Sequence, residues 1–282
     1  MTPPRGVRRL VVFGVALALV LCVPFAGKAV TVSPLAIFMD QRSRSSEIRL
    51  ANSSAHPEEV TIDLKYGFST TDSLERPMTP SFEPESVSAD APSAARWIRV
   101  FPRKVVLAPG QVQTVRLFAS PPPTLPDGEY WARFLASSRT LPDTTSAEQG
   151  ISAGISFLIV TSLPLWYRKG VVTTSAIVDT LDASAVSDSL RVRFVLSRGG
   201  NASYLGTAKF ALLDAREKPV REWQIPLSVY MHYRRRAVLP LDKAPPGTYT
   251  LAMTLSAVRA DLPLPSITPA ADARARVTVL VP

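Results

Sequence analysis

Cysteine is nearly absent from this 282-residue chain, in which Cys22 is the only one. Cys22 lies in an apolar N-terminal stretch, so the rest of the chain has no disulfide, no thiol nucleophile and no thiolate metal site. The other candidate metal ligands are scattered carboxylates. Asp179, Asp182 and Asp188 fall close together, but their spacing matches no calcium-binding loop. Because a glycine-rich phosphate loop is also missing, we expect neither a metal ion nor a cofactor.

Histidine is scarce as well, since His56 and His232 are the only two. This matters for residues 150–154, Gly-Ile-Ser-Ala-Gly, which fit the G-x-S-x-G pattern of a hydrolase nucleophile. That pattern requires a strand before it and a helix after it. Residues 155–160 are apolar and predict a strand instead, and only the two histidines could act as a base. We therefore expect no enzymatic activity and no small-molecule substrate.

A long basic stripe is also missing, and Arg234-Arg235-Arg236 is the only candidate. The formal net charge is +9, and residues 1–29 contribute four basic and no acidic residues, which leaves +5 for the remainder. Such a charge is ordinary for a soluble domain with interleaved acids and bases. We expect no nucleic-acid binding, and interpret the arginine triplet as a solvated strand face or a site for an acidic partner surface.

One apolar run is present near the N-terminus, Leu10–Val23, preceded by three arginines and followed by small residues at Gly27 and Ala29. This is the layout of a secretory signal peptide, and the run is short for a membrane span. We predict cleavage after Ala29, a mature protein that begins at Val30, and a periplasmic location. An uncleaved N-terminal anchor and a lipid on Cys22 are the alternatives.

Helical periodicity is almost absent after residue 29, whereas apolar residues occupy every second position of segments such as 60–66 and 190–196. This alternation is typical of half-buried antiparallel strands. Turn signals such as Pro109-Gly110 separate the segments, and the 26 prolines disfavour long helices. The sequence predicts an all-β protein with a signal peptide (1–29) and two tandem immunoglobulin-like β-sandwich domains (30–165 and 166–282).

The alternating segments predict strands throughout both halves of the chain. In the first half these are 30–39, 46–52, 59–68, 96–101, 104–107, 111–119, 129–137 and 151–163. In the second half they are 171–178, 189–197, 203–213, 220–232, 235–241, 247–258 and 273–281. The segments 69–95 and 138–150 are rich in proline or polar residues, so we expect surface loops there.

Several short segments of the first half carry a family resemblance. They are Val30–Asp40 with Glu47–Asn52, Phe101–Gly110, Gln111–Leu117, Leu125–Trp131, and Ile155–Val160 with Leu165–Arg168. In this order they resemble the N-terminal domain of PapD-like periplasmic chaperones, which assemble pili. The second half is similar to that family only as an immunoglobulin-like sandwich.

The resemblance implies a chaperone that donates its seventh strand to a pilus subunit lacking a strand of its own. Ladder hydrogen bonds would supply affinity, and pockets for alternate side chains would set the register. The matching positions are Ile155, Phe157 and Ile159, and the implied partners are pilus-like subunits and an outer-membrane usher. The alternative interpretation of this strand is one buried on both faces inside its own sandwich.

Two further expectations follow from the resemblance. The family's basic anchors for a subunit carboxylate fall on Ala36 and Ser162, which cannot act as charged donors. Arg116 and Glu129 match positions that form a buried ion pair near the domain interface, with Asp261 as a candidate third member. The missing anchors favour the alternative function, a structural or adhesive cell-envelope protein that has no client.

Overall fold

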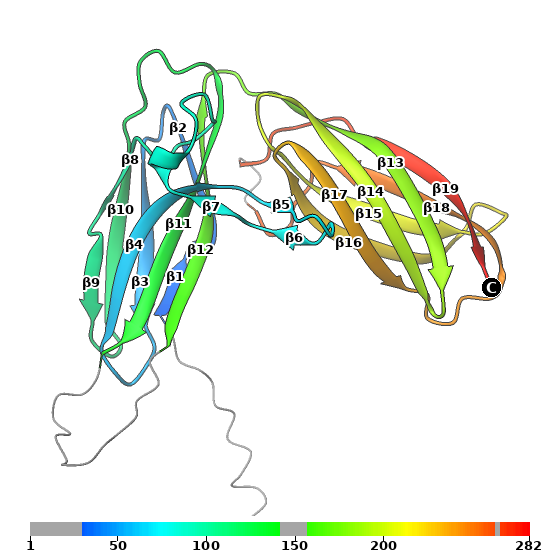
Figure 1. Ribbon diagram of the computed structural model, residues 1–282, viewed down its shortest axis with the longest axis horizontal. Coiled ribbons are helices and arrows are strands. Elements are labelled where there is room, and N and C mark those ends of the chain that lie inside the picture. Colours follow the sequence, from blue (N-terminus) through cyan, green and yellow to red (C-terminus); the bar gives the residue numbers. More distant parts are fainter. Residues whose placement is uncertain (1–29, 142–156, 263–265) are drawn as a thin grey trace, which may run out of the picture.

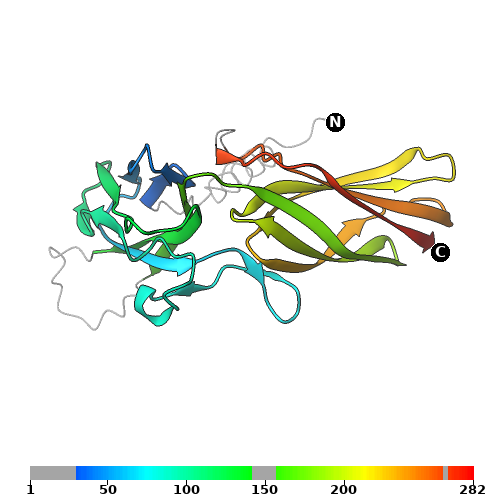
Figure 2. The same ribbon diagram turned by 90° about the horizontal axis from the view of Figure 1, so that it is seen from above.

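The chain folds into two β-sandwiches that follow one another along the long axis of the computed structural model (Figures 1 and 2). The structure describes residues 30–141, 157–262 and 266–282. Within these residues the only helical element is one 3-10 turn. The predicted all-β fold of two tandem sandwiches is therefore confirmed. The predicted signal peptide lies outside the described residues and stays a prediction.

The first sandwich contains ten of the strands drawn in Figure 1: β1 (Val30–Ser33), β2 (Ile37–Asp40), β3 (Ser45–Asn52), β4 (Glu58–Gly67), β7 (Ser81–Phe82), β8 (Ile98–Phe101), β9 (Lys104–Leu107), β10 (Val112–Ala119), β11 (Gly128–Thr140) and β12 (Leu158–Lys169). One sheet has the order β1-β3-β10-β8. The other has the order β2-β12-β11-β4-β7, with β9 also paired to β4. β12 continues through Lys169, so it extends beyond the predicted range 151–163.

Alternation of side chains builds the core of the first sandwich. Ile48 and Leu50 of β3 are fully buried, as are Val60 of β4 and Val115 and Leu117 of β10. Polar neighbours on each strand point to solvent, because successive side chains of a strand lie on opposite faces. The two sheets therefore meet through their apolar faces, and the hydrophobic effect holds them together.

The second sandwich contains β13 (Thr174–Val186), β14 (Ser189–Gly200), β15 (Tyr204–Leu213), β16 (Pro219–Val229), β17 (His232–Pro240), β18 (Gly247–Ser256) and β19 (Ala273–Val281). Its sheets have the orders β13-β14-β17 and β16-β15-β18-β19. β13 is longer than the predicted strand 171–178. A register shift between Val178 and Thr180 interrupts its alternation, which hid the second half of the strand from a period-two reading.

The segment 69–95 is not a plain surface loop, so that prediction is wrong. It contains β5 (Thr70–Thr71), β6 (Pro77–Met78), β7 and a 3-10 turn, η1 (Pro84–Ser86). Glu75 and Ala94 in this segment are buried. Figure 1 shows the β5–β6 hairpin leaving the first sandwich and reaching β16 and β17 of the second. The second domain buries the tip of this hairpin, and the polarity of the segment 69–95 alone does not reveal that contact.

An aromatic cluster fills the seam between the sandwiches. It joins Tyr66, Trp131 and Trp166 of the first domain with Leu205 and Tyr230 of the second. The rings of Trp131 and Tyr230 meet edge to face with centroids 4.8 Å apart. Aromatic pairs in this geometry add to the free energy of simple burial. The seam is therefore a packed contact.

No helix in the described parts of the chain is long and apolar enough to span a membrane. The same residues contain no group of three or more histidine, cysteine, aspartate or glutamate side chains arranged to hold a metal ion.

Candidate functional site

The N-terminal half of β12 lies at an incompletely paired sheet edge. β11 pairs with β12 over its whole length. On the other side β2 pairs with β12 only from Leu165 to Arg168. No other strand among the described residues pairs with positions 158–164 of β12. An unpaired edge presents backbone N–H and C=O groups to which a further strand can be added.

The side chains at this edge are apolar and exposed. Phe157, Leu158, Ile159 and Val160 are 72, 66, 46 and 51% exposed. Exposed apolar groups gathered on a strand edge indicate an interaction site more often than isolated ones do. The exposures also argue against a strand buried on both faces. Ile155, the third member of the predicted set, lies outside the described residues.

The two described members of the set continue the core-facing row of β12. Leu163, Leu165 and Tyr167 are buried in the core of the first sandwich. Side chains two positions apart share a face, and the β11–β12 ladder has no register shift. Phe157 and Ile159 therefore lie on the same face as that row, beyond the point where the chain's own core covers it.

A cleft of about 570 Å³ lies between the two domains, beside the paired half of β12. Ala36, Arg133 and Trp166 line its first-domain wall, and Tyr230 and Arg259 line its second-domain wall. Two of these five residues carry a guanidinium group. The cleft therefore combines aromatic walls with two guanidinium groups, of which that of Arg259 is paired with Asp261, a further lining residue.

Arg133 on β11 is the unusual residue of the cleft, because it is only 8% exposed. Its Nε donates to the Ser162 hydroxyl at 3.1 Å, and its Nη2 donates to the Ser162 carbonyl oxygen at 3.1 Å. In the described part of the chain no carboxylate lies within ion-pair distance of it. Burial lowers the pKa of Arg133. A buried guanidinium bonded only to neutral oxygens retains a strong attraction for an anion.

Sequence reasoning missed Arg133. The expected anchor positions both lie near it, since Ala36 lines the same cleft and Ser162 accepts its hydrogen bonds. A Cβ atom on Gly67 would lie 2.7 Å from the Arg133 Cγ, so only glycine leaves room for this side chain. The available signal was a lone arginine in the middle of the apolar segment 130–136.

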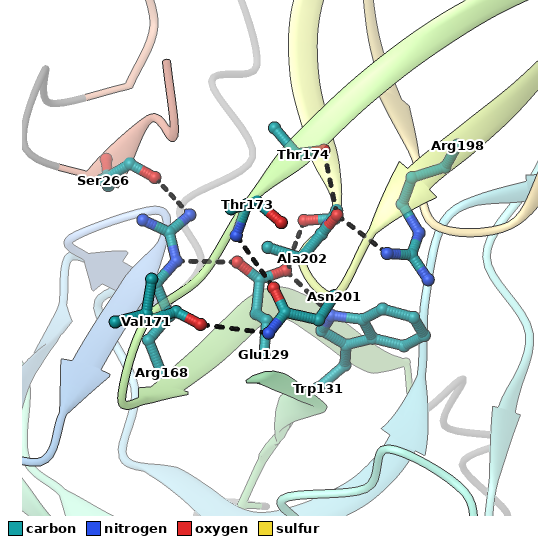
Figure 3. A network of polar contacts seen from close by, with 11 residues as sticks. Glu129, Trp131, Arg168, Val171, Thr173, Thr174, Arg198, Asn201, Ala202 and Ser266 are labelled. Atoms are coloured by element: carbon teal, nitrogen blue, oxygen red, sulfur yellow. Dashed lines mark hydrogen bonds and ion pairs between the residues drawn. The ribbon is translucent and has the colours of Figure 1, made fainter. Parts of the chain in front are cut away.

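Glu129 is the centre of a buried polar network between the domains (Figure 3). Its Oε2 accepts a hydrogen bond from Arg168 Nε at 2.8 Å, and their side chains are 0 and 15% exposed. Its Oε1 accepts bonds from Trp131 Nε1 at 2.9 Å, from the Ser203 backbone N–H at 3.0 Å and from the Ser203 hydroxyl. Arg168 Nη2 donates to the Ser266 carbonyl oxygen at 2.6 Å. The carboxylate thus connects both domains.

The predicted pairing of Arg116 with Glu129 is wrong. Arg116 Nε lies 3.1 Å from the Glu47 carboxylate, and both side chains are more than 60% exposed. β10 and β11 belong to different sheets, so these two side chains do not meet. Glu129 and Arg168 are instead directly opposite in the β11–β12 ladder. The prediction of a third member is also wrong, because Asp261 pairs with Arg259 at 2.5 Å.

The connection between the domains is fixed by polar contacts around Asn201 (Figure 3). The Asn201 carbonyl oxygen accepts the backbone N–H of Glu129 at 3.0 Å, and its side-chain oxygen accepts that of Thr173 at 2.8 Å. Gly170 has a φ of +61°, and a Cβ atom there would lie 2.0 Å from the Asp127 carboxylate. Glycine is therefore required at this turn between β12 and β13.

No family model and no curated protein sequence matches the chain. Among solved structures, the chain is similar to the YadV chaperone, with 12% identity, a TM-score of 0.44, and coverage of 88% of this chain and 99% of that one. It is also similar to the Salmonella enterica SafA pilin–SafB chaperone complex, with 12% identity, a TM-score of 0.43, and coverage of 89% of this chain and 97% of that one. A third similar structure is the CsuC–CsuE chaperone–subunit complex of Acinetobacter baumannii, with 16% identity, a TM-score of 0.41, and coverage of 74% of this chain and 89% of that one. All three similarities lie at 16% identity or less and at a TM-score of 0.44 or less.

Proposed function

We propose that the protein is a periplasmic chaperone that binds pilus-type protein subunits by adding its β12 edge to an incomplete subunit sheet. The observation that carries this proposal is the exposed apolar edge at residues 157–160. Phe157 and Ile159 continue a core-facing row, so they have the spacing of side chains that complete another sandwich. Strand addition of this kind needs no nucleotide, metal or catalytic group.

The cleft supplies a second element of the proposal. Arg133 lies near the paired end of β12, and an anionic group entering the cleft would meet its guanidinium. A terminal carboxylate is the group expected from a protein subunit whose last strand pairs along β12. Arginine can bind a carboxylate through two parallel hydrogen bonds, which fixes position as well as charge. Arg133 would then take over the role of the missing basic anchors.

Capture of a strand-deficient subunit is the direct test of the proposed function. The purified chain should bind a pilus subunit that lacks its final strand. It should not bind the same subunit when the missing strand is supplied as a covalent extension, because the groove is then filled. Co-elution in gel filtration measures both. Equal binding to the two forms, or to neither, contradicts strand addition and favours a structural envelope protein without a client.

Arg133 should contribute to subunit affinity through the subunit's terminal carboxylate. A charge-assisted hydrogen bond contributes about 1.5–3 kcal/mol, so Arg133→Gln should weaken binding by roughly 10- to 150-fold. Titration calorimetry against a normal subunit and a C-terminally amidated one measures the effect. The loss should vanish with the amidated subunit. Arg139→Gln, on the same strand but 55% exposed at its side chain, is the matched control. An equal loss with both subunits would contradict the assignment.

A further inference from the structure

The β5–β6 hairpin has a well-defined turn. Thr70 pairs with Met78 and Thr71 with Pro77. One Asp72 carboxylate oxygen accepts the backbone N–H groups of Leu74 and Arg76, both at 2.9 Å. Glu75, at the tip, has a φ of +62°, a conformation that non-glycine residues adopt only when their surroundings impose it. The turn therefore holds Glu75 in a set position.

The tip of the hairpin is bound to the second domain. The Arg193 Nε donates to both Glu75 carboxylate oxygens at 2.9 Å, and its Nη2 donates to Oε1 at 2.6 Å. The Arg236 Nε donates to Oε2 at 2.9 Å. The Arg236 backbone N–H also donates to the Glu75 carbonyl oxygen at 3.3 Å. The Glu75 side chain is only 9% exposed, although it lies at the end of a long segment from the first domain.

The Glu75 carboxylate reduces a repulsion between the two arginines that receive it. Arg193 of β14 and Arg236 of β17 are directly opposite each other in their ladder, and like charges in that position repel. The Arg193 guanidinium lowers the pKa of Glu75, so the carboxylate stays charged at neutral pH. One acid thereby binds both members of a cross-strand pair of cations and reduces their mutual repulsion. The contact is specific for a carboxylate at the hairpin tip.

The hairpin also forms part of the space between the domains. Thr70, Met78 and Arg235 line a cavity of about 480 Å³, which shares Ser69, Ser228 and Arg259 with the cleft beside Arg133. Besides the aromatic seam, polar contacts thus join the domains at two separate places, the Glu129 network beside the β12–β13 turn, called the hinge below, and the Glu75 contact at the hairpin. With polar contacts at both places, the second sandwich is less free to rotate relative to the first than it would be with the hinge contacts alone.

We propose that the β5–β6 hairpin is an interdomain latch, in which Glu75 held between Arg193 and Arg236 fixes the angle between the sandwiches and the width of the cleft. Release of Glu75 opens the cleft, and the hinge then becomes the remaining polar tether. This inference goes beyond the proposed chaperone function, because it concerns the free protein and requires no subunit.

Spin-label distance measurements test the latch. Nitroxides at Arg99→Cys and Lys209→Cys, in a Cys22→Ser background, report the separation of the two domains. The doubly labelled protein with Glu75 unchanged should give one narrow distribution of distances between the two nitroxides. Glu75→Gln should broaden it, and Glu75→Lys, which places a third cation beside the arginines, should broaden it further and shift its mean. Hydrogen exchange of residues 70–78 should be several-fold faster in both variants.

The matched control is Glu217→Gln, which breaks an exposed ion pair to Arg276 inside the second domain. It should leave the distance distribution unchanged. Glu75 lies outside both cores, so its variants should keep the near-ultraviolet circular dichroism of the folded chain. Distributions that match the parent in both Glu75 variants, or broadening in Glu217→Gln as large as in Glu75→Gln, would overturn the proposal.

Discussion

Replacing Phe157 and Ile159 with aspartate should abolish subunit binding while leaving the protein folded. Each large apolar side chain contributes roughly 1.5–3 kcal/mol when it is buried, so losing two should weaken the complex by about two to four orders of magnitude. The exposures of these side chains, 72 and 46%, indicate that the free chain does not need them for its own core. Co-purification with a strand-deficient subunit measures the loss.

The control for this prediction lies on the same strand. Leu158→Asp with Val160→Asp adds the same charge to the opposite face of β12, where side chains are 66 and 51% exposed. If the face of Phe157 and Ile159 enters the subunit, the control should retain much more affinity. Equal losses in the two double variants would mean that the edge binds without a preferred face. Unfolding of the Phe157/Ile159 variant would assign those side chains to the chain's own core.

Replacing Glu129 with alanine should destabilise the protein by about 3–5 kcal/mol, because it leaves the Arg168 guanidinium as an uncompensated charge. The side chains of the pair are 0 and 15% exposed, so water replaces the lost carboxylate poorly. The hydrogen bonds from Trp131 and Ser203 disappear with it. Chemical denaturation of the full chain, followed by tryptophan fluorescence, measures the change.

A double-mutant cycle separates the pair from its surroundings. Glu129→Ala, Arg168→Ala and the double variant should give a coupling energy above about 1 kcal/mol. Glu47→Ala is the matched control, because it breaks an ion pair with Arg116 whose side chains are 61 and 64% exposed. An exposed pair contributes under about 1 kcal/mol. Coupling near zero for Glu129 and Arg168, or an equal effect at Glu47, would contradict the assigned role.

The all-β fold could be predicted from the sequence because a half-buried strand has a local pattern of alternating apolar and polar residues. Ile48 and Leu50 flank Arg49 on β3, and Leu190 to Leu196 alternate on β14, so the period-two pattern marks the buried face directly. The apolar run after residue 154 predicted a strand, but its interpretation as a binding edge came from the family resemblance. A bulge interrupts this alternation after Val178, and β13 was therefore predicted too short.

Partners of charged side chains were decided by the tertiary structure. Arg116 and Glu129 are close in sequence but lie in different sheets, whereas Arg168 stands opposite Glu129 because of the β11–β12 register. Glu75 meets Arg193 and Arg236 across a sequence separation of more than a hundred residues. An ion pair needs its two groups within about 4 Å, and that distance depends on sheet order, register and domain docking together. Alternation in the sequence determines which face of a strand is buried, but the packed chain alone determines what each buried charge touches.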